Sequence, residues 1–232
     1  MLKVREAFQN GIIPKKEYSL IVKRFPIVVS GISRIEKASG VNFPIAYVEP
    51  SITMSPSSVN SFEYGILFAR TIPIIAKNDL HVVIQISAPL VAYGLKGTIH
   101  AILAHEFLHY LELVRKISDM ELVSDEISAN LFENVYADSE RLFEPRAVFT
   151  DKTLISHITK KFPSGFRDYK LEDKVIKYWI EKNLPTSNMT LDTNIAKLSP
   201  DLVSKIRLAP NFISKIKSFE LKASKLRKKR LY

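Results

Sequence analysis

His105-Glu106-Phe107-Leu108-His109 lies inside the apolar run TIHAILAHEFLHYLELV, which extends from Thr98 to Val114. Two histidines four residues apart on a helix are about 40° apart around its axis, so both imidazoles project from one face and can bind one metal ion. Glu106 is roughly 60° from His109 on the same side, close enough to hold a water molecule and accept its proton. The spacing therefore predicts two metal ligands and a general base on one helix.

The opposite face of the same helix is apolar, which predicts that it packs into a core. With 5 histidines in 232 residues, a chance H-E-x-x-H has a probability of roughly 0.7%. The alternative is a solvated or ion-paired face, but bare polar groups are costly on a buried helix. His100 falls on the back of the helix, so we expect a hydrogen-bonded core residue there and not a ligand. The apolar face consists of Leu103, Phe107, Leu111 and Val114.

A third ligand must be His, Asp or Glu, because the chain has no cysteine. The helix is expected to end near Lys116, and Ser118–Glu121 is typical of a capping box that opens a second helix. In the resulting hairpin, His109 and Glu126 both lie about 12–13 Å from the turn, on adjacent helices. We therefore predict Glu126 as the third ligand. Glu121 is rejected, because it lies close to the turn, points about 140° away from Glu126 and serves the cap.

Asn130 follows Glu126 by one helical turn and shares its face. It is placed to hydrogen-bond the outer ring nitrogen of a ligating histidine. The alternative is an ordinary polar residue at the edge of a helix.

HEFLH followed by Glu126-Ile127-Ser128-Ala129-Asn130-Leu131-Phe132 resembles the gluzincin group of zinc metallopeptidases, whose third ligand is a glutamate on the next helix. The E-x-x-A-N-x-F pattern is similar to the ImmA/IrrE metallopeptidase family. Thermolysin-like enzymes are a looser match, with Asp expected where Asn130 stands, and Leu108 replaces a residue that is usually small in these families. The resemblance implies Zn²⁺ on His105, His109 and Glu126, with Glu106 as the general base.

The composition, 46% hydrophobic and 25% charged, is typical of a soluble globular protein. The absence of cysteine excludes disulfides and fits a reducing cytoplasm, which is the predicted location. The first residues lack the apolar core of a signal peptide, and Lys23, Arg24 and Pro26 interrupt the longest early apolar run. We therefore expect no export signal and no transmembrane segment.

Residues 15–39 predict a helix that is kinked or split near Pro26 and ends at Gly40. Four β-like runs follow, and a loop over 87–97 leads into the metal-binding helix. The expected class is α+β, and the resemblance implies a zincin-like catalytic domain: a small mixed sheet, an active-site helix and a following ligand helix. In that architecture the last strand, within His81–Ile86, borders the cleft and can pair with an extended peptide; the alternative is a plain edge or core strand. The β-like runs are 41–48, 62–70, 72–76 and 81–86.

Charge divides the chain near residue 150. Residues 1–150 carry 15 Lys and Arg against 16 Asp and Glu, whereas 151–232 carry 19 against 8, so −1 and +11 give the net +10. We predict a metallopeptidase domain over 1–150 and a basic helical C-terminal extension over 151–232. Helices are expected there at 168–183, 200–208 and 210–230. His157 is a candidate for steadying an oxyanion at the metal.

The last twelve residues, 221–232, hold six basic residues and no acidic one. Three interpretations remain open: a solvated helix end, a contact with nucleic acid or an acidic partner, and a membrane-surface patch.

The function predicted from these features is a zinc-dependent metallopeptidase that acts on a peptide or protein substrate. One alternative is a regulatory or binding protein with a structural or degenerate zinc site and a nucleic-acid-contacting C-terminal region. The other is a metal hydrolase that acts on a non-peptide bond, because H-E-x-x-H identifies the water-activating device and not the substrate.

Overall fold

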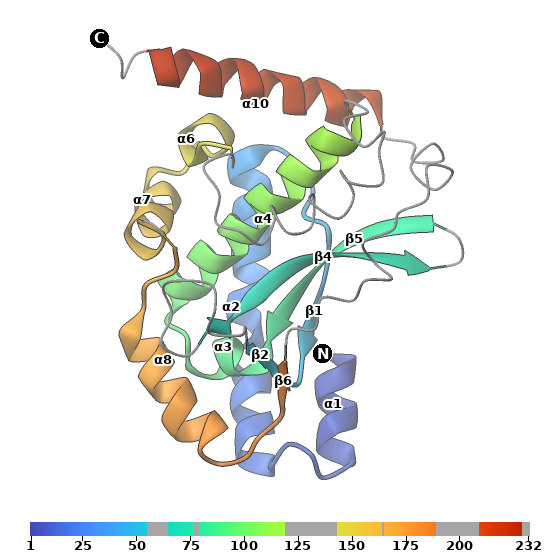
Figure 1. Cartoon of the computed structure of the whole chain (residues 1–232), viewed down its shortest axis with the longest axis vertical. Helices are drawn as coiled ribbons and strands as arrows, with labels where there is room; N and C mark the ends of the chain where they lie inside the picture. The colour runs from blue at the N-terminus through green and yellow to red at the C-terminus, as the bar shows by residue number, and fades with distance from the viewer. Residues whose placement is uncertain (55–64, 77–78, 119–142, 164, 189–208, 229–232) are drawn as a thin grey trace.

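The computed structural model describes residues 1–54, 65–76, 79–118, 143–163, 165–188 and 209–228 (Figure 1). The predicted capping box beyond Ser118, the second helix with Glu121, Glu126 and Asn130, and the predicted helix at 200–208 lie outside these residues. Within them, helices combine with two small sheets, which confirms the predicted α+β class. No helix of the described part of the chain is long and apolar enough to cross a membrane.

The N-terminal part consists of two helices, α1 (Leu2–Gln9) and α2 (Lys15–Ser39). Gly40 ends α2 in the left-handed conformation with φ of 67°, which glycine adopts without a steric penalty. Pro26 lies inside α2, and the helix is not split there. A proline costs one backbone hydrogen bond, but buried residues occur on both sides of Pro26, and their packing stabilises α2 as one continuous helix. That face includes Ile21, Val28 and Ile35.

The larger sheet has the order β1-β5-β4 and is mixed, as predicted. Strand β1 (Ile45–Glu49) runs parallel to β5 (Asp79–Ser87), and β4 (Ala69–Ala76) runs antiparallel to β5. The second sheet, which the sequence did not predict, has the order β3-β2-β6. Its strands are β2 (Ile52–Met54), β3 (Ile66–Leu67) and β6 (Thr186–Asn188).

The central position of β5 corrects the expectation that this strand can pair with an extended peptide. Residues Val83–Ser87 pair with β1 on one side, and Asp79–Ile86 pair with β4 on the other. The backbone groups of the shared stretch are therefore used within the sheet, and the core-strand alternative holds. Among the described strands, β4 forms the edge that packs against the helix with the H-E-x-x-H motif.

The predicted loop over 87–97 contains a short helix, α3 (Ala88–Tyr93), which corrects the sequence interpretation. The hydroxyl of Ser87 accepts a hydrogen bond from the backbone N–H of Leu90, and Pro89 occupies the first turn, where its missing N–H costs nothing. The five residues Ala88–Ala92 are all buried. Their burial stabilises a helix that would be too short to form alone.

Helix α4 (Lys96–Ser118) carries the H-E-x-x-H motif and runs through the middle of the molecule (Figure 1). The chain then forms α6 (Pro145–Val148), α7 (Lys152–Lys161) and α8 (Tyr169–Val175), which continues into a π-helical turn, η1 (Ile176–Ile180). Helix α10 (Pro210–Lys228) begins with proline, as predicted, and crosses the C-terminal half of α4 (Figure 1).

The segments on the two sides of the predicted boundary at residue 150 share one hydrophobic core. Leu154 and Ile158 of α7 pack against α4, and Phe219 of α10 contacts Phe143 with ring centroids 6.4 Å apart. Strand β6 adds to the sheet begun by β2. The described residues after 150 therefore belong to the same packed structure as α4 and cover part of that helix.

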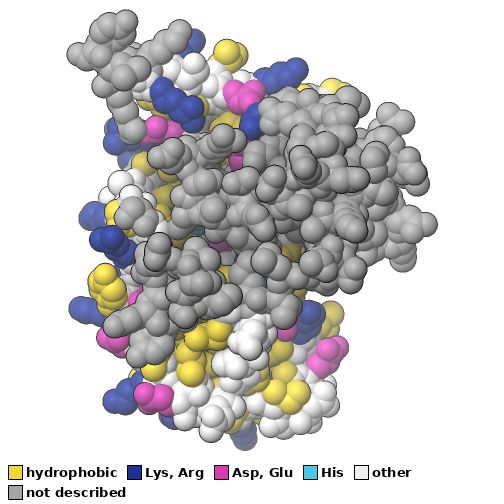
Figure 2. All heavy atoms as spheres, viewed as in Figure 1, with side chains coloured by type: hydrophobic (Ala, Val, Ile, Leu, Met, Phe, Trp, Pro, Cys, Tyr) yellow, Lys and Arg dark blue, Asp and Glu magenta, His cyan; other side chains and the backbone are white. Residues whose placement is uncertain are grey.

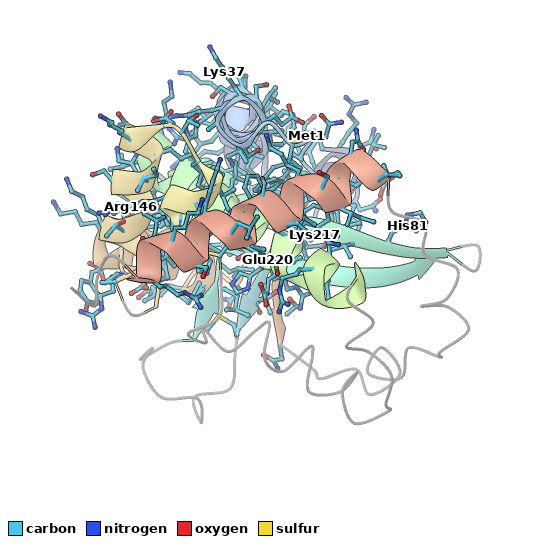
Figure 3. The ribbon with its side chains drawn as sticks, turned by 90° about the horizontal axis from the view of Figure 1, so that it is seen from above. Met1, Lys37, His81, Arg146, Lys217 and Glu220 are labelled. Atoms are coloured by element: carbon cyan, nitrogen blue, oxygen red, sulfur yellow. The ribbon has the colours of Figure 1, made fainter. Side chains whose placement is uncertain are left out.

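Many of the basic side chains of the C-terminal region are exposed. Figure 2 shows Lys and Arg along the edge of the molecule formed by α7 and α8, with Asp and Glu among them. From above, Lys37 of α2, Arg146 of α6 and Lys217 of α10 lie on one face (Figure 3). All three are exposed, and Lys217, which alone of them belongs to the C-terminal region, places part of the charge predicted there at the surface.

Candidate metal centre

Helix α4 brings the three predicted residues of the motif together. His105, Glu106 and His109 are 7%, 8% and 6% exposed, and one potential ligand atom of each lies within 4.8 Å of the others. The Nε2 atoms of the two histidines are 3.0 Å apart. The helical spacing thus produces a buried cluster of two imidazoles and a carboxylate.

The geometry of the two imidazoles fits a shared zinc ion. Two nitrogens bound to one tetrahedral zinc at about 2.0–2.1 Å are about 3.3 Å apart, which is close to the observed 3.0 Å between Nε2 of His105 and Nε2 of His109. Without a metal, this separation suits a hydrogen bond from a protonated ring nitrogen to an unprotonated one. Imidazole nitrogens and carboxylate oxygens are both ordinary zinc ligands, so the donor set also fits.

The back face of α4 packs as predicted. Phe107 stacks on Phe43, with ring centroids 5.4 Å apart, and also contacts Phe149 at 6.2 Å. This packing fixes the rotation of α4 about its own axis, so the histidines must face the other way. The four predicted back-face residues are at most 3% exposed: Leu103, Phe107, Leu111 and Val114.

Thr71 of β4 contacts Glu106 from the neighbouring sheet. Its Oγ1 lies 2.9 Å from Oε2 of Glu106 and 2.9 Å from the backbone carbonyl oxygen of the same residue. Thr71 is 2% exposed and pairs with Ile84 in the register of the sheet. The sequence indicates that Thr71 lies next to a strand, but no local pattern in it predicts the contact with Glu106.

Phe162 contacts His105 from the end of α7. The two rings are stacked, with centroids 3.8 Å apart and planes 8° apart. Phe162 in turn contacts Phe166 at 5.4 Å, and Phe166 contacts Phe68 at 5.2 Å, so an aromatic row runs from the centre toward the start of β4.

Neither Phe162 nor the helix that ends beside it was predicted, although the sequence carries a signal for α7. The Asp151 side chain caps the helix by accepting from the backbone N–H of Leu154 at 2.9 Å. Leu154 and Ile158, four residues apart, form its buried face.

His100 is the core histidine that the sequence predicted. It is 2% exposed, and its Nε2 lies 3.2 Å from the carbonyl oxygen of Ile27. Its Nδ1 lies 3.4 Å from Nη1 of Arg34. Burial lowers the pKa of His100, and the nearby Arg34 charge acts in the same direction.

His157 does not approach the metal centre, which corrects its candidacy as an oxyanion-stabilising group. Its ring lies beside Gly97 in the first turn of α4, with Cε1 3.0 Å from the position that a Cβ on Gly97 would occupy. Gly97 precedes His105 by eight residues, about 12 Å along the helix axis.

Glu112 continues the histidine face of α4 by one turn beyond His109. It is 5% exposed and bonded to Arg115, whose Nη2 lies 2.8 Å from Oε1 of Glu112. Arg115 also lies 3.7 Å from Glu220, which Figure 3 shows on α10. This charge network connects α4 to α10 and was not predicted.

Glu126 and Asn130 lie outside the described residues, so the third ligand and its neighbour stay predictions. The described part of the centre holds two candidate ligands, a candidate base and the two residues that contact them from other elements, Thr71 and Phe162.

A scan against protein-family models, a search of curated proteins and a search of solved structures each found no match to this chain.

Proposed function

We propose that this protein is a zinc-dependent metallopeptidase of the gluzincin kind, with His105, His109 and Glu126 as the zinc ligands. The observation that carries the proposal is the convergence of two imidazole nitrogens 3.0 Å apart with a buried carboxylate on one helix. Burying such groups is costly unless they are paired or bind a metal.

Glu106 is assigned as the general base. A zinc ion held by the histidines would polarise the scissile carbonyl and lower the pKa of the attacking water. The Glu106 carboxylate takes one proton from that water while the water oxygen bonds to the carbonyl carbon. When the C–N bond breaks, Glu106 returns the proton to the leaving amine nitrogen. Its burial beside the ligands keeps bulk water from competing for this proton.

A zincin-like arrangement of the catalytic domain is part of the proposal. Two features support it: α4 packs against β4, and β4 is the edge of the larger sheet among the described strands. An extended peptide that paired with β4 would pass close to Thr71 and therefore to Glu106. Strand β4 thus takes the role that the sequence interpretation assigned to β5.

The experiment that tests the proposal compares zinc-loaded wild-type protein with its Glu106→Gln variant on a mixture of synthetic peptides, with cleavage products identified by mass spectrometry. Wild type should cleave a subset of the peptides. The variant should bind the same amount of zinc and lose hydrolysis by about 10² or more.

Equal cleavage by the two proteins would exclude Glu106 as the base. A zinc-loaded wild type that cleaves no peptide would favour a structural zinc site or a non-peptide substrate.

A further inference from the structure

We infer that Thr71 is a positioning residue for Glu106: it holds the carboxylate in the orientation that presents one oxygen to the metal centre. The inference rests on the proposed function for its catalytic consequence. Its structural basis is the contact between Thr71 Oγ1 and Glu106 Oε2 at 2.9 Å, between residues that are 2% and 8% exposed.

The position of the Thr71 hydroxyl is set by the sheet and not by α4. Thr71 lies within the antiparallel ladder of β4 and β5, opposite Ile84, and its branched side chain has few rotamers on a strand. A glutamate side chain, in contrast, has three rotatable bonds between its backbone and its carboxylate. A rigid donor on the neighbouring strand therefore restricts a flexible acceptor on the helix.

The same hydroxyl suits both protonation states that a general base passes through. It lies 2.9 Å from Oε2 and also 2.9 Å from the backbone carbonyl oxygen of Glu106. When the carboxylate is charged, the hydroxyl donates to Oε2. When Glu106 holds the proton on Oε1, Oε2 is still an acceptor, and the carbonyl offers the hydroxyl a second acceptor nearby. The other oxygen, Oε1, is assigned the role of taking and returning the proton.

The first test compares kcat, KM and zinc affinity of Thr71→Val and Thr71→Ser, using a quenched fluorescent peptide chosen from those that wild type cleaves. Valine keeps the shape and removes the hydroxyl, so kcat should fall about 10- to 100-fold with KM little changed. Serine should restore most of the loss. Zinc affinity should stay within about twofold of wild type, because Thr71 contacts the base and not the histidines.

The matched control is Thr53→Val, which removes a buried hydroxyl from β2, where it faces Ser187 at 3.2 Å. It should leave kcat unchanged. A Thr71→Val protein with the same kcat as this control would overturn the inference. If the valine variant does not fold, Thr71→Ser and Thr71→Ala give the same comparison, because both lack the methyl group and only serine keeps the hydroxyl.

A second test needs no hydrolysis. A double-mutant cycle of Thr71→Val and Glu106→Ala, measured by urea unfolding of the metal-free chain, should show coupling of about tenfold or more in the unfolding equilibrium constant. Absence of coupling would overturn the inference even if peptides are cleaved. Coupling in a protein that cleaves no peptide would support the positioning contact and overturn the proposed function, so the two failures are distinguishable.

Discussion

The Phe162 ring lies parallel to the His105 imidazole, with 3.8 Å between the ring centroids. The contact joins the end of α7 to α4, and it restricts rotation of the imidazole about its χ2 bond. A residue from the C-terminal third of the chain therefore forms one wall of the candidate metal centre. The basic C-terminal region, which the sequence predicted as a separate extension, thus contributes Phe162 to the site.

Phe162→Ala should lower zinc affinity about tenfold, because an unrestrained imidazole loses more freedom when it binds a metal. It should also lower the free energy of unfolding by about 2 kcal/mol, less than the value for a fully buried phenylalanine, since Phe162 is half-buried. Competition with a chromophoric zinc chelator measures the affinity.

The control for this change is Phe212→Ala, which removes a half-buried ring that stacks on Tyr110 at 6.1 Å. It should cost similar stability and leave zinc affinity at the wild-type value. Equal zinc affinity in the two variants would show that the stack on His105 has no role in metal binding.

Metal analysis should find about one zinc ion per chain, because the centre offers one set of ligands. His109→Ala should remove most of it, and Glu126→Ala should weaken binding strongly if Glu126 is the third ligand. Glu121→Ala should leave zinc content near wild type and cost at most about 0.5–2 kcal/mol, the contribution of a helix cap. If the zinc content per chain were unchanged in both His105→Ala and His109→Ala, these residues would not form a metal centre.

The pair formed by Arg34 and Asp151 should make stability depend on pH in the acid range. Arg34 Nε and Nη2 lie 2.6 and 2.9 Å from the two Asp151 oxygens, and these hydrogen bonds lower the pKa of Asp151 from 3.8 to about 2. A lowered pKa contributes stability that is fully present above 3.8 and is lost as the pH falls toward about 2.

Asp151→Asn should therefore lose about 1 kcal/mol at neutral pH and flatten the dependence of unfolding free energy on pH between 4 and 2. Asparagine is the suitable replacement because it keeps an acceptor for the cap of α7. Urea unfolding of the metal-free protein across this pH range measures both effects. A variant with an unchanged slope would mean that other carboxylates dominate.

The basic end of α10 should act as a solubilising surface. Lys222, Lys225 and Arg227 are exposed, and no base-reading element accompanies them in the described chain. We expect the chain of 232 residues to show no saturable binding to a DNA or RNA oligonucleotide at physiological salt.

If binding does occur, replacing these three residues by glutamine should reduce the slope of log K against log salt by about 0.9 per lost contact with B-DNA. Zinc content should not change. Point substitutions are preferable to deleting 221–232, because deletion also removes Ala223, which is buried against the body of the protein.

The sequence alone determined what depends on local helix geometry. A spacing of four residues places His105 and His109 on one face wherever that segment is helical, and the apolar residues on the opposite face predict which side packs inward. The end of α2 at Gly40 and the beginning of α10 at Pro210 are also set by local backbone geometry, so the sequence predicted both. Each of these depends on neighbours within one or two turns.

The tertiary structure decided the contacts that depend on chain topology. Thr71 meets Glu106 across 35 residues of sequence, and β5 became a central strand because β1 pairs with it from far upstream. The segment 88–93 is helical because its apolar side chains are buried by α2 and other elements, although Pro89 and the glycines that follow the segment suggested a loop. Such pairings depend on the apolar area that the whole chain buries when it folds. A local sequence pattern therefore does not predict them.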